Sequence, residues 1–141
     1  FNWYEGDKTA SPATCSSPDE FVKYVDALDP DYFVACLDIG HSAMENTGGG
    51  SPAEMIRALG GQRLKSLHIH DNNLISDLHT LPFTQKIDWD DTMKALKEIG
   101  YDGEFTFEAD RFLQQFPEEL VDHASKMMLE VGRYFVTKYE L

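Results

Sequence analysis

Residues 32–41 read YFVACLDIGH, and this stretch decides the fold. Its first six residues form a nearly continuous apolar run of strand length. Such runs are typical of strands that are covered on both faces, as in parallel sheets. Asp38 and His41 follow directly at the carboxyl end of the run. The stretch therefore predicts a buried strand that ends in polar side chains, and it predicts that Cys36 is a buried thiol.

Two later segments repeat this arrangement of a strand-length run followed by polar residues. Residues 64–70 read LKSLHIH and precede Asp-Asn-Asn, and residues 104–108 read EFTFE. Glycines at positions 60, 61 and 100 bound these segments, as expected for strands between turns. They predict a second strand that ends with His68 and His70 and a third strand that ends with Glu108.

Four amphipathic segments flank the predicted strands. Two of them begin with the capping-box pattern, SPDE at 17–20 and SPAE at 51–54. A third helix is expected to begin with Asp88 as its cap and to end at Gly100, and a long fourth helix is expected from Pro117. One stripe of the fourth helix contains Leu120, Ala124, Met127, Val131 and Phe135. Residues 1–16 are expected to be irregular because glycine, serine and proline interrupt any regular spacing of apolar residues.

The alternation of helices and strands predicts βα units and a parallel sheet. We expect one α/β domain over residues 1–141, with about three parallel strands and four helices. Asp38, His68 and Glu108 are 30 and 40 residues apart, which suits one βα unit for each interval.

Ionisable side chains gather at the predicted carboxyl ends of the three strands. Ligands bind at these ends in parallel α/β sheets, so Asp38, His68 and Glu108 should point at one place. Two carboxylates and an imidazole can hold Mn²⁺, Co²⁺, Mg²⁺ or Zn²⁺. The sequence therefore predicts a divalent metal site.

Each of these residues also has a purely structural interpretation. Asp38 could cap the next segment, and His68 could be a satisfied buried histidine. His70 shares a strand face with His68 and either lines the site or packs at its rim. Asp77 and His79 lie in a long loop and could simply be solvated.

The overall composition excludes several classes of function. The formal net charge is −13, which disfavours binding to nucleic acid or to an anionic membrane surface. No apolar run is long enough to cross a membrane, and no signal peptide is visible. Two cysteines are too few for a disulfide scaffold, so a cytoplasmic location is expected. The absence of a starting methionine fits a chain cut from something longer.

The motifs together resemble the xylose isomerase-like barrel superfamily, in particular its sugar phosphate isomerase/epimerase branch. The ordered segments that carry the resemblance span about residues 32–112 and include LDIGH, LHIHDN, DLH with LPF, IDW and GYDG followed by FE. The resemblance implies a (β/α)8 TIM barrel whose last three strands and flanking helices this chain supplies. It implies that Asp38, His68 and Glu108 are metal ligands and that His41 binds substrate. The family's fourth ligand is a glutamate that would lie just before Phe1, and Glu5 is a poor substitute.

The resemblance also implies a chemistry for the parent protein. A divalent metal and carboxylate proton transfer would interconvert a sugar or sugar phosphate through an enediolate, with Glu108 and His41 as catalytic residues. His70, Asp77 and His79 would contact substrate, and the last two also resemble extra metal residues of endonuclease IV-like branches. The alternatives are a metal phosphodiesterase of that kind, an inosose-type dehydratase, and a non-catalytic half-barrel.

The chain is too short for a whole barrel of this fold, which takes about 250 residues. Three strands leave open edges, and open edges invite pairing with another chain. We therefore expect self-association or pairing with the missing half-barrel, and activity that needs the absent part.

Overall fold

The computed structural model describes residues 2–4, 9–45 and 47–141, with side chains from Pro12 onward except at position 46. Glu5 therefore lies outside the described residues. The centre of the fold is a three-stranded sheet in which β3 (Ala35–Asp38), β4 (Leu64–Ile69) and β5 (Glu104–Phe107) are parallel and neighbours in that order. The predicted α/β fold with three parallel strands is confirmed.

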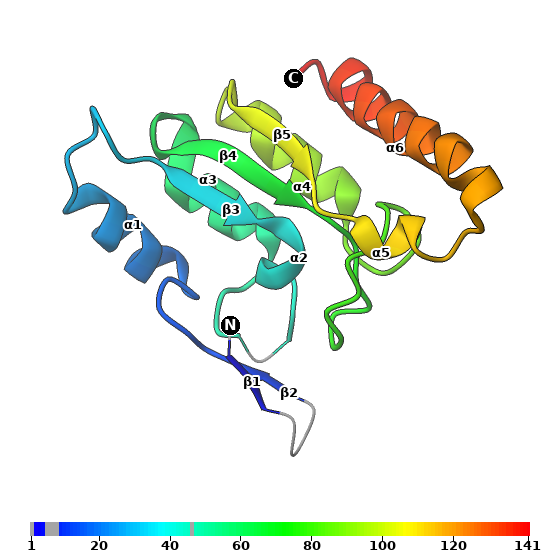
Figure 1. The fold of residues 1–141 in the computed structure, drawn as a ribbon. Coiled ribbons are helices and arrows are strands. Elements are labelled where there is room, and N and C mark those ends of the chain that lie inside the picture. Colours follow the sequence, from blue (N-terminus) through cyan, green and yellow to red (C-terminus); the bar gives the residue numbers. More distant parts are fainter. Residues whose placement is uncertain (1, 5–8, 46) are drawn as a thin grey trace.

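The helices cover one face of this sheet and its β5 side (Figure 1). The four longer helices match the expected ones and are α1 (Pro18–Asp26), α3 (Pro52–Arg63), α4 (Trp89–Glu98) and α6 (Glu118–Tyr139). Two short helices were not predicted, α2 (Ile39–Ser42) after β3 and α5 (Asp110–Leu113) after β5. A single helical turn contains too few residues to reveal a period of 3.6 in the sequence.

Near the N-terminus, β1 (Asn2–Tyr4) and β2 (Thr9–Ser11) form an antiparallel pair. The expectation that residues 1–16 are irregular was wrong for these two strands. Each strand is only three residues long, so no alternation of apolar and polar residues could be recognised.

The predicted helix caps were confirmed at two helices and wrong at a third. The Ser51 hydroxyl accepts a hydrogen bond from the Glu54 amide, and the Glu54 carboxylate accepts one from the Ser51 amide. Asp88 caps α4, where its carboxylate accepts a hydrogen bond of 3.0 Å from the Asp91 amide. Ser17 makes no side-chain cap at α1, and the Glu20 carboxylate accepts a hydrogen bond of 2.8 Å from the Cys15 amide rather than from the Ser17 amide.

The core lies between the sheet and the helices that cover it. Alternate strand residues such as Leu37, Leu67 and Ile69 are fully buried there. The helices contribute Ile56, Leu59, Met93, Leu96 and Phe135. Each such side chain contributes roughly 1.5–3 kcal/mol through its removal from water. This packing fixes the direction in which the strand ends point.

The opposite face of the sheet is open in the part of the chain that the structure describes. Cys36 lies on this face and is exposed, so the prediction of a buried thiol was wrong. The apolar run at 32–37 was read as covered on both faces, but residues 32–34 precede the strand and are more than half exposed. Leu120 and Met127 of the predicted α6 stripe are also exposed, whereas Ala124 and Phe135 are buried.

Candidate metal centre

The carboxyl ends of the three parallel strands bring Asp38, His68 and Glu108 together. Asp38 ends β3 and is directly opposite His68 on β4, while Glu108 follows β5 and its amide donates to the Ile69 carbonyl. One ligand atom from each residue lies within 4.8 Å of the others. His68 Nδ1 is 3.1 Å from Glu108 Oε2 and 3.8 Å from Asp38 Oδ2. The structure thus brings the three predicted residues together; that they bind a cation remains a prediction.

Asp38 is both the cap of a helix and a member of this group. Its Oδ1 accepts a hydrogen bond of 2.8 Å from the His41 amide, which caps α2. The same oxygen is 3.0 Å from His70 Nε2, and Oδ2 is 3.0 Å from His41 Nδ1. Burial alone would raise the pKa of Asp38, but the hydrogen bonds from His41 and His70 outweigh it and hold the pKa well below its usual range. Asp38 is therefore a carboxylate with a fixed orientation.

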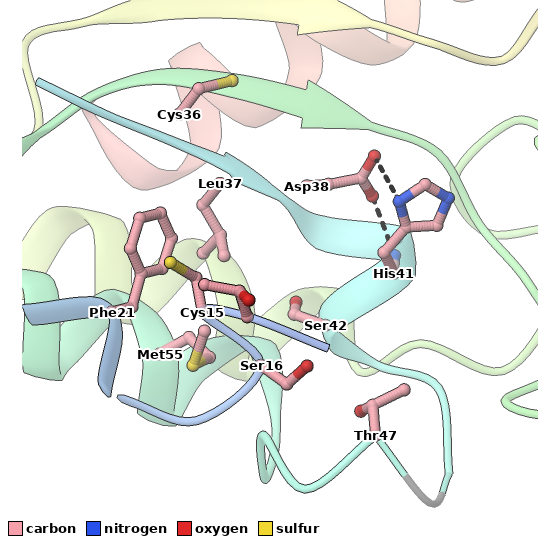
Figure 2. Close-up of a pocket in the computed structure, with 11 residues that line it drawn as sticks. Cys15, Ser16, Phe21, Cys36, Leu37, Asp38, His41, Ser42, Thr47 and Met55 are labelled. Carbon is pink, nitrogen blue, oxygen red and sulfur yellow. Dashed lines mark hydrogen bonds and ion pairs between the residues drawn. The ribbon is translucent and has the colours of Figure 1, made fainter. Parts of the chain in front are cut away.

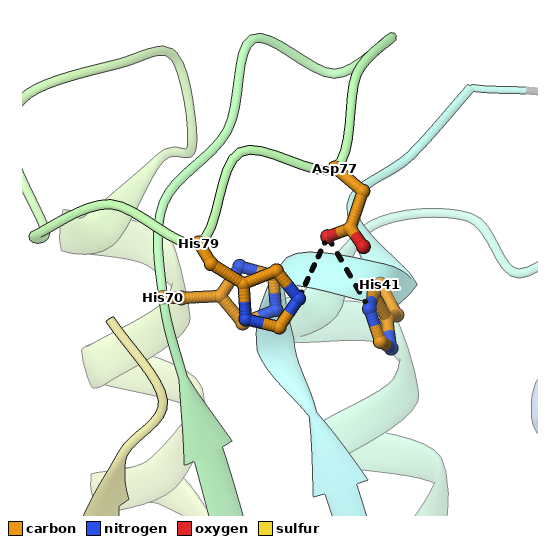
Figure 3. A group of neighbouring side chains, drawn as sticks. All are labelled: His41, His70, Asp77 and His79. Atoms are coloured by element: carbon orange, nitrogen blue, oxygen red, sulfur yellow. Dashed lines mark ion pairs between the residues drawn. The ribbon is translucent and has the colours of Figure 1, made fainter. Parts of the chain in front are cut away.

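A second group of ionisable side chains adjoins the first and contains His41, His70, Asp77 and His79 (Figure 3). Asp77 Oδ1 lies between two imidazoles, 3.3 Å from His41 Nε2 and 3.0 Å from His79 Nε2. Burial would lower the pKa of His41, but its hydrogen bonds to Asp38 and Asp77 outweigh this and raise the pKa to about 9. The loop residues Asp77 and His79 therefore face the site.

Asp71 holds the loop that carries Asp77 and His79. Its carboxylate is fully buried and accepts hydrogen bonds from four donors: the amides of Asn72, Gln85 and Ile87 and the indole of Trp89. These donors lie at both ends of the loop, so Asp71 closes it. Sequence reasoning missed this role, although an aspartate directly after a strand and before a long loop was a signal for it.

His70 is the buried member of this second group. Its side chain is fully buried, and its ring stacks on that of His79 with centroids 4.0 Å apart and planes 6° apart. Its predicted contact with substrate stays a prediction.

A cavity of about 210 Å³ opens beside Asp38 and His41 (Figure 2). Hydroxyl groups of Ser16, Ser42 and Thr47 line it on one side. The apolar side chains of Phe21, Leu37 and Met55 complete the wall. The cavity thus offers polar and apolar surface directly next to Asp38 and His41.

The donor set of Asp38, His68 and Glu108 fits a divalent cation. Two carboxylates and one imidazole are ligands that Mn²⁺, Co²⁺, Mg²⁺ and Zn²⁺ all accept. Glu108 Oε2 is shielded from solvent, yet its 3.1 Å approach to His68 Nδ1 lacks the geometry of a hydrogen bond. A shielded carboxylate oxygen without a donor would gain a partner from a cation at this position.

A parallel sheet with such a group at its carboxyl edge is the arrangement expected for one part of a (β/α)8 barrel. The sequence profile of the family named Xylose isomerase-like TIM barrel matches residues 7–131, and the chain belongs to this family. The resemblance to the xylose isomerase-like superfamily is thereby confirmed, and with it a superfamily of the sugar isomerase and epimerase type.

The chain is also similar to a solved structure and to two curated proteins. The crystal structure of a D-tagatose 3-epimerase-like protein superposes with a TM-score of 0.55 and 25% identity, over 85% of this chain and 46% of that one. Uncharacterized proteins of Sinorhizobium fredii and Methanocaldococcus jannaschii are 36% and 34% identical over 59% and 65% of this chain. The matched part of the chain spans only 26% and 31% of these two proteins, about a quarter to a third of their length.

None of the helices that the described residues form combines the length and the apolar character needed to cross a bilayer.

Proposed function

We propose that the protein is a divalent-metal-dependent isomerase or epimerase of a sugar or sugar phosphate. The observation that carries this proposal is the convergence of Asp38, His68 and Glu108 within 4.8 Å at the carboxyl edge of the sheet. Active sites of (β/α)8 barrels lie at this edge. The likeness to a D-tagatose 3-epimerase-like protein supports a sugar as substrate.

The chain's own residues suit the proton transfer that such a reaction needs. A cation held by Asp38, His68 and Glu108 would polarise the substrate carbonyl and stabilise the enediolate that forms next to it. Glu108 would accept the proton from the carbon beside the carbonyl and return it to the neighbouring carbon in an isomerase. In an epimerase, a second carboxylate on the other side would return it to the same carbon. His41 would donate a hydrogen bond to a substrate oxygen.

We also propose that the protein completes its barrel with strands that this chain does not supply. β3 and β5 have no outer strand partner among the described residues, and Cys36 and Thr106 on the open face are exposed. Tyr32, Phe33 and Val34 beside β3 are more than half exposed. Either the rest of the protein or a second copy would cover them. This pairing would be contradicted if light scattering showed the 141-residue chain to be a monomer and a denaturation curve showed that this monomer unfolds cooperatively.

A phosphodiesterase of the endonuclease IV kind is the second candidate. The group of His41, Asp77 and His79 beside Asp38 favours it, because two neighbouring cations suit phosphate ester hydrolysis. A cation in this group would take the place of the 3.3 Å ion pair between His41 Nε2 and Asp77 Oδ1. The net charge of −13 argues against a nucleic acid substrate.

Cation binding is the first test of the proposal. Co²⁺ should bind the protein, and His68→Ala and Glu108→Ala should each remove most of the affinity. The matched controls are His123→Ala and Glu130→Ala, which alter exposed residues of α6 and should bind like the parent. Equal affinity in all five proteins would contradict the site.

The reaction class is tested by isotope exchange in D2O. An isomerase or epimerase should incorporate deuterium into a ketose next to its carbonyl, as measured by proton NMR, and Glu108→Gln should abolish this. Hydrolysis of bis(p-nitrophenyl) phosphate without any deuterium incorporation would favour the phosphodiesterase instead.

A further inference from the structure

His70 joins the two groups of ionisable side chains, and Figure 3 shows it between β4 and the loop residue His79. On one side its Nε2 lies 3.0 Å from Asp38 Oδ1. On the other side its ring stacks in parallel on His79 at 4.0 Å. The side chain is fully buried, so neither contact is an accident of a mobile surface residue.

The protonation pattern of this pair follows from the chemistry of its atoms. A carboxylate only accepts hydrogen bonds, so His70 Nε2 carries the hydrogen and donates it to Asp38. Nδ1 of the same ring is shielded from solvent and has no hydrogen-bond partner among the described residues. A simple core filler would be an apolar ring, which leaves no nitrogen without a partner. The imidazole at this position is therefore explained by its bond to Asp38.

The backbone around His70 is shaped for its ring. Gly40 lies directly against the imidazole, and a methyl group at this position would overlap three ring atoms. The Gly40 carbonyl in turn accepts a hydrogen bond of 2.6 Å from the Asn72 side chain. Asn72 thus holds the Gly40 backbone, which lies against the His70 ring.

We propose that His70 is a positioning residue that couples the cation site to the loop over residues 72–87. It orients the Asp38 carboxylate through Nε2, and it supports His79, and with it Asp77, through ring stacking. This inference rests on the proposed function, because it assigns Asp38 to a cation. Hydrogen-bond partners of metal-binding carboxylates typically change metal affinity by about 10–100-fold.

Two substitutions separate the two contacts of His70. His70→Phe keeps an aromatic ring that can stack on His79 but removes the donor to Asp38. His70→Gln keeps a donor near the position of Nε2 but removes the ring. The matched control is His123→Phe, which changes an exposed histidine of α6.

The readouts are Co²⁺ affinity, followed by visible absorption, and amide hydrogen exchange over residues 76–80. His70→Phe should bind Co²⁺ about 10–100-fold more weakly, with loop exchange close to that of the parent. His70→Gln should recover the affinity to within about threefold of the parent, while its loop exchanges faster. A residue that only fills the core would not give these opposite results.

The outcomes distinguish this inference from the proposed function. If His68→Ala loses Co²⁺ binding and His70→Phe binds like the parent, the positioning role is wrong and the cation site stands. If His70→Gln keeps the loop as protected as the parent does, the coupling to the loop is wrong. A parent protein that binds no Co²⁺ overturns the proposed function and this inference with it.

Discussion

Asp38 and His41 form a closed unit at the end of β3, because the carboxylate of Asp38 accepts from the His41 amide and contacts the His41 ring at 3.0 Å. One residue therefore ends a strand, begins a helix and points into the candidate cation site. These roles use different properties of the side chain. The cap needs only an acceptor oxygen, whereas a divalent cation also needs the negative charge.

Asp38→Asn should separate the two roles. Asparagine is as good a helix cap as aspartate, so the cap itself should survive, but the melting temperature of the cation-free protein should fall because the charged partner of His41 and His70 is lost. Co²⁺ affinity should fall by at least about 100-fold, beyond the effect of a lost neighbouring hydrogen bond. Calorimetry without metal and titration with metal measure the two effects. An unchanged affinity would exclude Asp38 as a ligand.

Gly40→Ala should disturb His70 by direct overlap. Overpacking of a tight site costs about 1–3 kcal/mol, and we expect a loss of unfolding free energy in that range. The double variant Gly40→Ala with His70→Ala should be more stable than the sum of the single effects, because the overlapping ring is gone. Urea unfolding of the four proteins measures this, and strictly additive effects would show that the two residues do not meet.

Asp71→Asn should loosen the loop over residues 72–87. Asparagine carries an NH2 group where aspartate has a second acceptor oxygen. This NH2 group would face at least one of the four N–H groups that donate to the Asp71 carboxylate. Hydrogen bonds to a charged group contribute about 1.5–3 kcal/mol each, so the loss should be at least of this order. Hydrogen exchange should rise in this loop. Asp122→Asn on the exposed side of α6 is the control and should match the parent.

Leu67→Ala should destabilise the fold without changing any side chain of the site. Leu67 is fully buried in the centre of the sheet, and removal of such a side chain costs about 2–5 kcal/mol. Leu129→Ala on the exposed side of α6 should cost less than about 0.5 kcal/mol. Denaturant midpoints compare the two variants, and equal losses would mean that the described core is incorrect.

The sequence predicted those parts of the fold that depend on local patterns. The segment at 64–70 became β4, and the Ser51–Glu54 capping box formed as expected, because both signals lie within a few adjacent residues. Cys36 was mispredicted because its exposure depends on which elements cover the other sheet face. An apolar run in the sequence does not show which faces of its strand other elements cover.

The candidate site was predictable to a similar extent. Asp38, His68 and Glu108 were placed together correctly because parallel strands bring their carboxyl ends to one edge. The roles of Asp71 and Gly40 were missed because they arise from long-range contacts, with the Trp89 indole and with the His70 ring. Such contacts leave no local period in the sequence.

The most direct test of the central claim is the anomalous scattering of Co²⁺ in crystals of the protein. The proposal predicts an anomalous peak from an ion that Asp38, His68 and Glu108 coordinate, with the imidazole nitrogen at about 2.0–2.1 Å from the ion. A saturated crystal with no peak between these three residues would contradict it. So would a peak held only by His41, Asp77 and His79.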